Sequence, residues 1–152
     1  MREETIKGFF VGDVDPELLN AEALQAIVQH DDICSSVAIT DMNNSFGITR
    51  NSVIRLCDAG MSGKLSASAL NAIAFALIAS DRFEWNDDII SEVIFDWSAP
   101  EINYPLTPFN LSMNKDWLLG ISAPPERPAL PSGHPPGKLV SRRMKVEDAN
   151  HA

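Results

Sequence analysis

The sequence predicts a mainly α fold, a small helical bundle of about five helices with one short β-hairpin. Three observations lead to this prediction. Apolar residues recur at helical spacing in several segments. Residues that favour helix starts precede these segments. Only residues 36–49 are rich in β-branched side chains around a turn. The length of 152 residues suits one domain.

Two helices are expected in the first 30 residues. Residues 4–11 can form one or two helical turns that stop at Gly12, since glycine suits the left-handed closing position of a helix. Asp15 is a capping residue before Pro16, and proline is favoured at the first helical position. The apolar spacing that follows predicts a helix over residues 15–30.

The hairpin and the next two helices are expected from their boundary residues. Residues 36–49 surround the turn-rich stretch 41–44, which favours a short β-hairpin. Thr49 or Asn51 can cap the following helix, which Gly60 would close.

A capping residue, Ser66, precedes residues 67–80. These are apolar on almost every side, so this helix is expected to be central and buried.

The last two helices have equally clear boundaries. Asn86 can cap a helix that carries its apolar residues on one stripe and turns its acidic residues away, and Pro100 ends it. Thr107 and Pro108 repeat the arrangement of a cap followed by proline, and Gly120 closes this final helix.

Residues 123–152 contrast with the helical segments. Prolines and glycines are concentrated from Ala123 onward, and few apolar groups are present to offset the entropy of ordering the chain. We therefore predict a helical domain over residues 1–122 and a disordered Pro-rich tail over residues 123–152. Neither a signal-peptide layout nor an apolar run of the about 20 residues needed to span a bilayer is found, which predicts a cytoplasmic protein.

The net charge of −9 is unevenly distributed. Residues 1–122 contain 18 acidic and 7 basic side chains, a net charge of −11, whereas residues 123–152 contain 3 and 5, a net charge of +2. An acidic body repels phosphate backbones and anionic lipids, so nucleic-acid and membrane partners are not expected. A basic protein partner is compatible with the charge, and so is an acidity that only maintains solubility.

The chain lacks a recognisable catalytic or metal-binding pattern. His30 is the one histidine outside the tail and is expected at a helix end. Cys34 and Cys57 have no metal-ligand spacing and are expected to be reduced core thiols. The glycine-rich stretch 60–64 lacks the residue spacing of a phosphate-binding loop. We therefore predict no catalytic residue, no cofactor and no metal.

Acidic and aromatic residues alternate over residues 81–104. Seven acids and the single base Arg82 occur between residues 81 and 101, a composition suited to docking a basic protein patch. A solvated helix face with its aromatic residues in the core is the alternative. Trp85 is expected to be exposed or half exposed, and the Tyr104–Pro105 bond is a candidate for the cis form. The predicted partner-binding residues are Asp81, Glu84, Trp85, Asp87, Asp88, Glu92, Asp96, Glu101 and Tyr104.

Two sequence strings within this region carry a family resemblance. ASDRFEW at residues 79–85 and DWSAPEINYPLT at residues 96–107 resemble a family of small uncharacterised bacterial proteins, over residues 46–119. This resemblance implies no activity. The corner Gly63, Leu65, Ser66 is also similar to that of the colicin D type of immunity proteins, helical inhibitors of secreted nuclease toxins. That similarity covers a few residues and transfers no inhibitory residue.

Two segments of the chain also resemble each other. Residues 10–19 and 61–70 share a glycine, an apolar residue two positions later, a helix cap next, and a leucine four positions after the cap. This pattern predicts two helical corners, with duplication and chance both open as its origin.

These features favour a non-enzymatic protein-binding module, in its most specific form an immunity-type inhibitor of a basic nuclease toxin. The alternatives are a structural or regulatory subunit that associates through apolar surface, and a hydrolase with paired carboxylates. The sequence gives no indication of the oligomeric state.

Overall fold

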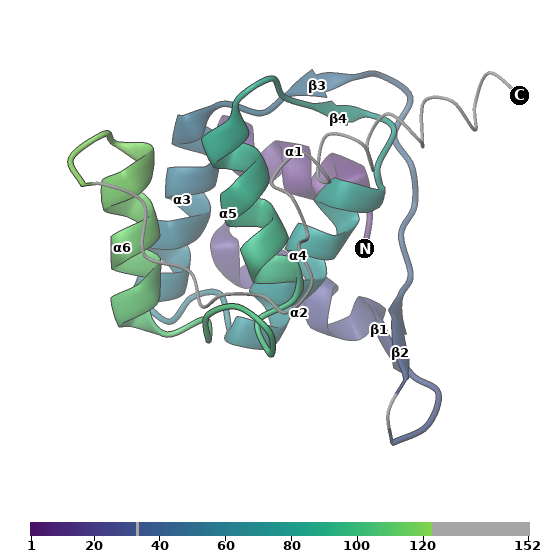
Figure 1. The fold of residues 1–152 in the computed structure, drawn as a ribbon. Coiled ribbons are helices and arrows are strands. Elements are labelled where there is room, and N and C mark those ends of the chain that lie inside the picture. Colours follow the sequence, from purple (N-terminus) through teal and green to yellow (C-terminus); the bar gives the residue numbers. More distant parts are fainter. Residues whose placement is uncertain (33, 123–152) are drawn as a thin grey trace, which may run out of the picture.

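The computed structural model describes residues 1–32 and 34–122, and within them the chain is mainly helical (Figure 1). This confirms the predicted fold class. The predicted tail, residues 123–152, lies outside the described residues. The helices are α1 (Glu3–Val11), α2 (Pro16–Ala26), α3 (Arg50–Met61), α4 (Ala67–Ala79), α5 (Asp88–Ser98) and α6 (Pro108–Leu118). The strands are β1 (Ile27–Gln29), β2 (Ser35–Val37), β3 (Phe46–Gly47) and β4 (Phe83–Glu84).

The antiparallel hairpin is formed by β1 and β2, with Ile27 opposite Val37. The helix predicted over residues 15–30 therefore ends at Ala26, because the β-branched residues that follow pair with β2. The hairpin predicted within residues 36–49 is wrong. Its second half, β3, instead pairs in parallel with the distant β4.

Two helical corners connect α1 to α2 and α3 to α4, as the sequence predicts. Gly12 and Gly63 adopt positive φ angles of 88° and 80°. In the first corner the backbone N–H groups of residues 13 and 14 both donate to the Gly8 carbonyl, at 2.7 and 3.1 Å. In the second, those of residues 64 and 65 both donate to the Ala59 carbonyl, at 2.9 and 3.1 Å. The two corners thus share one hydrogen-bonding pattern.

Gly60 does not close α3, contrary to the prediction. The helix continues to Met61, and Gly63 adopts the left-handed conformation instead. A Cβ atom on Gly60 would lie 2.6 Å from Leu111 Cδ1 and 2.7 Å from Leu70 Cδ1. The glycine therefore permits close packing of α3 against α6 and α4.

Helix α4 packs against α2, α3 and α5 and contributes seven buried residues to the core, as expected for the central helix. Phe75 is an exception to the prediction that this helix is buried on every side, because its side chain is 44% exposed.

Side-chain caps fix most helix starts. Ser66 Oγ accepts the Ala69 N–H at 3.1 Å, and Thr107 Oγ1 accepts the Asn110 N–H at 3.2 Å, as predicted. Thr49 is the cap of α3 rather than Asn51.

The predicted cap of α5 is off by one residue. Asp87 caps this helix in place of Asn86, and its Oδ1 accepts the Ile89 N–H at 2.9 Å. Adjacent Asn and Asp residues are both good caps, so the sequence alone does not separate them.

Candidate partner-binding surface

The segment from the end of α4 through β4 to the start of α5, which we call the junction, is held in place at β4 by backbone pairing and a serine. Ser80 Oγ accepts the backbone N–H groups of Arg82 and Phe83 at 2.9 and 3.2 Å. The Phe46 N–H donates to the Arg82 carbonyl, and the Ile48 N–H donates to the Glu84 carbonyl, both at 2.8 Å. The start of β4 is therefore fixed on both sides.

Phe83 anchors this junction in the core. Its ring is 2% exposed and meets Phe10 and Phe46 edge to face, with ring centroids 6.1 and 6.2 Å apart. Because successive strand side chains point to opposite faces, Glu84 points outward when Phe83 points inward.

Three carboxylates at this junction, Asp81, Glu84 and Asp88, are exposed and together form what we call the acidic rim. They lie within eight residues of the chain. Among the residues that the structure describes, no ion pair involves any of them. Their charges therefore remain available to solvent or to a partner.

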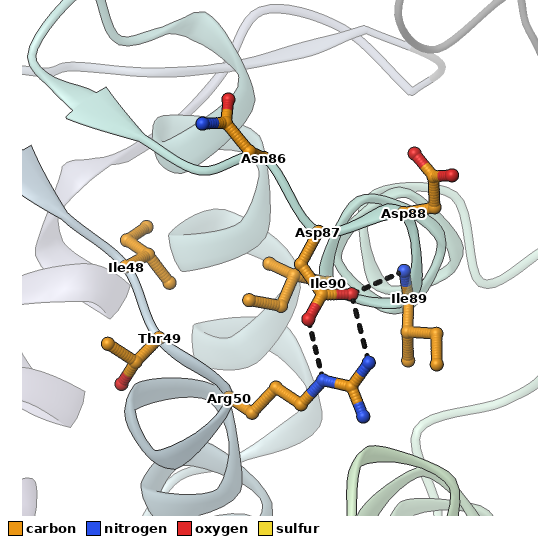
Figure 2. A pocket seen from close by; sticks show the side chains of 8 residues that line it. All are labelled: Ile48, Thr49, Arg50, Asn86, Asp87, Asp88, Ile89 and Ile90. Carbon is orange, nitrogen blue, oxygen red and sulfur yellow. Dashed lines mark hydrogen bonds and ion pairs between the residues drawn. The ribbon is translucent and has the colours of Figure 1, made fainter.

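Asp87 lies between the rim residues but is engaged differently. The Arg50 Nε donates to Asp87 Oδ2 at 2.6 Å (Figure 2). The Arg50 hydrogen bond is the main cause that lowers the pKa of Asp87 below its ordinary value, with help from the cap on Ile89. Asp87 is therefore a structural ion-pair partner as well as a helix cap.

Trp85 is half-buried, as the sequence predicts. Its Nε1 donates to Ser91 Oγ at 2.6 Å, which orients the indole between β4 and the first turns of α5. The side chain packs against the core and stays partly accessible. This combination suits an aromatic anchor in a binding surface.

The remaining predicted site residues do not join the rim. Asp96 is 2% exposed, so the prediction that it turns away from the apolar stripe is wrong. It lies seven residues after Ile89 and three after Val93, which places it at the border of that stripe. Glu92 is half-buried on α5.

Glu101 and Tyr104 belong to the other end of α5. In Figure 1, β4 leads into the upper end of this helix and the loop to α6 leaves its lower end. A helix of 11 residues is about 16 Å long. The predicted surface is therefore divided, with exposed Glu101 and half-buried Tyr104 about one helix length from the rim. The Tyr104–Pro105 bond is trans, since the described residues contain no cis peptide.

An open pocket adjoins the rim between the first turns of α3 and α5 (Figure 2). Its lining residues are Ile48, Thr49, Arg50, Asn86, Asp87, Asp88, Ile89 and Ile90. The Arg50 side chain crosses from α3 to Asp87, and its Nη1 also donates to the Leu118 carbonyl at 3.2 Å. Arg50 was not among the predicted partner-binding residues. The sequence signal that could have pointed to it is a basic residue directly after a helix cap, Thr49, in a chain with few bases to pair with its many acids.

The histidine and cysteines are placed differently from expectation. His30 follows β1 instead of ending a helix, and its Nε2 is 2.8 Å from Ser36 Oγ. Cys57 is buried as expected, and burial raises the pKa of its thiol to about 12. Cys34 is exposed, so its assignment to the core is wrong.

The described residues contain no group of three His, Cys, Asp or Glu side chains positioned to hold a metal ion. None of their helices has the length and apolar character needed to cross a bilayer. No family model, curated protein or solved structure matches this chain.

Proposed function

We propose that this chain is a non-enzymatic protein-binding module that docks a basic protein surface on the acidic rim. The observation that carries the proposal is the set of three exposed carboxylates without an ion-pair partner among the described residues. They occupy a junction that Ser80, Phe83 and Asp87 hold in place, so a partner would meet a preorganised surface.

The surface combines charge with an aromatic anchor. Trp85 lies between Glu84 and Asp88 in the chain, and tryptophan is enriched among residues that dominate binding energy. Acidic side chains around it would steer a basic partner and select against acidic ones. The net charge of −11 over residues 1–122 adds long-range attraction for such a partner.

The most specific form of this proposal is an immunity-type inhibitor of a basic nuclease toxin. A nuclease must attract a phosphate backbone, so its active surface is basic. An inhibitor that masks that surface needs exposed and uncompensated negative charge. The rim supplies this charge, while the resemblance of the Gly63 corner to colicin D type immunity proteins is the sequence observation that motivates the idea.

The test is a comparison of two triple charge reversals. The full chain is immobilised, a host protein is retrieved at low salt and identified, and its dissociation constant is then measured with purified proteins. In the rim variant, lysine replaces Asp81, Glu84 and Asp88. In the control variant, lysine replaces Asp13, Glu17 and Asp41, which are also exposed and also outside the described ion pairs.

The proposal predicts a basic partner whose affinity falls about tenfold or more in the rim variant and much less in the control. Higher salt should weaken binding to the unmodified chain. An acidic partner, or equal affinity for the two variants, would contradict the proposal. A nuclease that the unmodified chain inhibits would support the immunity-type form, and a partner without nuclease activity would contradict that form alone.

One observation favours a second function, association through apolar surface as a structural or regulatory subunit. Phe109 and Ile102, at the connection of α5 to α6, are 72% and 56% exposed. Binding through these side chains would persist at high salt and would be weakened by Phe109→Ser. Binding through the rim would weaken at high salt and would be unaffected by Phe109→Ser.

A further inference from the structure

The open pocket beside the rim is lined by both apolar and acidic side chains. Ile48, Ile89 and Ile90 contribute apolar atoms to its lining, and Ile89 is only half-buried. Asp87 and Asp88 also line the pocket, and Asp88 is exposed. Arg50 forms an ion pair with Asp87 and not with Asp88. A ligand with cationic side chains would therefore find negative charge beside an apolar lining.

The chain leaves the helical body close to this pocket. The Arg50 guanidinium donates both to Asp87 and to the Leu118 carbonyl, so the last residue of α6 lies next to the first turn of α5. Gly120 then has a φ of 75°, and the Ile121 N–H donates to the Asp116 carbonyl at 2.9 Å, which turns the chain at the end of the helix. Ser122 follows directly.

The sequence beyond Ser122 contains a segment of matching chemistry. Residues 138–145 carry four basic side chains and no acidic one, interspersed with apolar ones. The basic residues are Lys138, Arg142, Arg143 and Lys145, and the larger apolar ones are Leu139, Val140 and Met144. We propose that residues 138–145 bind in the pocket between α3 and α5 of the same chain, with their basic side chains against Asp88 and the rest of the acidic rim.

The connection is long enough for this contact. Sixteen residue steps separate Ser122 from Lys138. At about 3.3 Å per residue they span up to about 50 Å, about three times the length of an 11-residue helix such as α5. Six of the ten prolines of the chain occur in residues 124–136, within this connection. Because the segment is tethered to the body that carries the pocket, its binding is intramolecular, and even a weak site can be occupied.

The inference is independent of the proposed function, because the segment can bind whether or not the rim also docks another protein. If both hold, the segment and the partner compete for the same negative charge. The segment would then act as an internal competitor that lowers the apparent affinity for the partner.

The test uses paramagnetic broadening in the full chain. A nitroxide is attached at Ala149→Cys, just beyond the segment, in a Cys34→Ser background, because Cys57 is buried and will not be labelled. The proposal predicts selective loss of amide signal at Thr49, Asp88 and Ile89. A mixture of isotope-labelled chain without nitroxide and unlabelled chain with nitroxide should show no such loss.

Two matched pairs of variants assign the contact. Arg142→Glu should restore the signals, whereas Arg127→Glu, the same change outside the segment, should not. Asp88→Lys should restore the signals elsewhere around the pocket, whereas Glu101→Lys at the other end of α5 should not. Uniform broadening, absence of broadening at the pocket, or equal broadening in the mixed sample would overturn the proposal. No second protein is present, so these outcomes do not bear on the proposed function.

Discussion

Arg50 Nε donates to Asp87 Oδ2 across 2.6 Å and so joins the first turns of two helices that are 37 residues apart in the chain. The same guanidinium reaches the carbonyl of Leu118 at the end of α6. Both charged side chains are partly exposed, at 41% and 29%, so solvent screens their attraction. The main effect of the pair is geometric, because it fixes where α5 begins and therefore where Asp88 is presented.

The first prediction concerns acid stability. Arg50 lowers the pKa of Asp87, so the unfolded chain takes up this proton at a higher pH than the folded chain does. The stabilisation is present above the unfolded pKa of about 3.9 and is lost as the pH falls through the folded value. Asp87→Asn removes this dependence while keeping a good helix cap. Thermal unfolding midpoints should therefore fall less in Asp87→Asn than in the unmodified chain between about pH 5 and about pH 2.

Asp13→Asn is the control for this measurement, because Asp13 is exposed and outside the described ion pairs. It should keep the acid dependence of the unmodified chain. If Asp87→Asn also keeps it, the ion pair with Arg50 does not contribute to stability.

A second prediction tests the close approach of three helices at Gly60. The added methyl group of Gly60→Ala would meet Leu111 and Leu70, whose side chains are each 1% exposed and cannot move into solvent. Overpacking of this kind costs about 1–3 kcal/mol, and with contacts of 2.6 and 2.7 Å to two buried methyl groups this cost outweighs the about 1 kcal/mol gained from helix propensity. Denaturant unfolding should show a lower free energy of unfolding.

Gly47→Ala is the matched substitution, because a Cβ atom there would have no neighbour within 4 Å and Gly47 has no positive φ. It should change the free energy of unfolding by less than about 0.5 kcal/mol. A Gly60→Ala variant as stable as Gly47→Ala would show that the helices can separate at little cost.

The helix boundaries were largely predictable because capping is local chemistry. The hydroxyls of Thr49, Ser66 and Thr107 each accept a backbone N–H three residues later, and the sequence alone carries this signal. The corner glycines Gly12 and Gly63 are equally local, since a positive φ favours glycine.

The strand pairings were not predictable, because they depend on partners distant in the chain. Phe46 pairs with Phe83, and both rings enter one aromatic cluster with Phe10. The helical spacing of residues 15–30 also gave no sign that Ile27 would pair with Val37. Tertiary packing decided both cases.

For the candidate site, the sequence predicted which residue types are present better than it predicted which of them are exposed and lie together. Asp81, Glu84 and Asp88 are exposed as expected, whereas Asp96 is buried. Helical periodicity locates the centre of an apolar stripe, but the width of the buried face depends on how many neighbours cover the helix. That number is a property of the whole fold.

A third prediction compares two tryptophans. Trp97 and Asn114 are 1% and 7% exposed, and Trp97 Nε1 donates to Asn114 Oδ1 at 3.0 Å. Trp97→Phe leaves this oxygen buried without its donor and also leaves a cavity, which together cost about 2–4 kcal/mol. Trp85→Phe removes a similar hydrogen bond at a half-buried position, so it should cost less. Equal losses of unfolding free energy would contradict the difference in burial.

The last prediction concerns the two thiols, which the structure assigns to different environments. Burial raises the pKa of Cys57 to about 12, and the thiolate is the reactive form, so this thiol should be inert at about pH 8 in the folded protein. Cys34 is exposed and should react with a thiol reagent at once. The native chain should therefore titrate one thiol, and the denatured chain two. Cys34→Ser should abolish the native signal and Cys57→Ser should preserve it.

Rapid reaction of both thiols in the native chain would mean that α3 opens readily and exposes the core beside Leu56. Slow reaction of Cys57, at the rate of global unfolding, would show that this helix opens only when the whole fold opens.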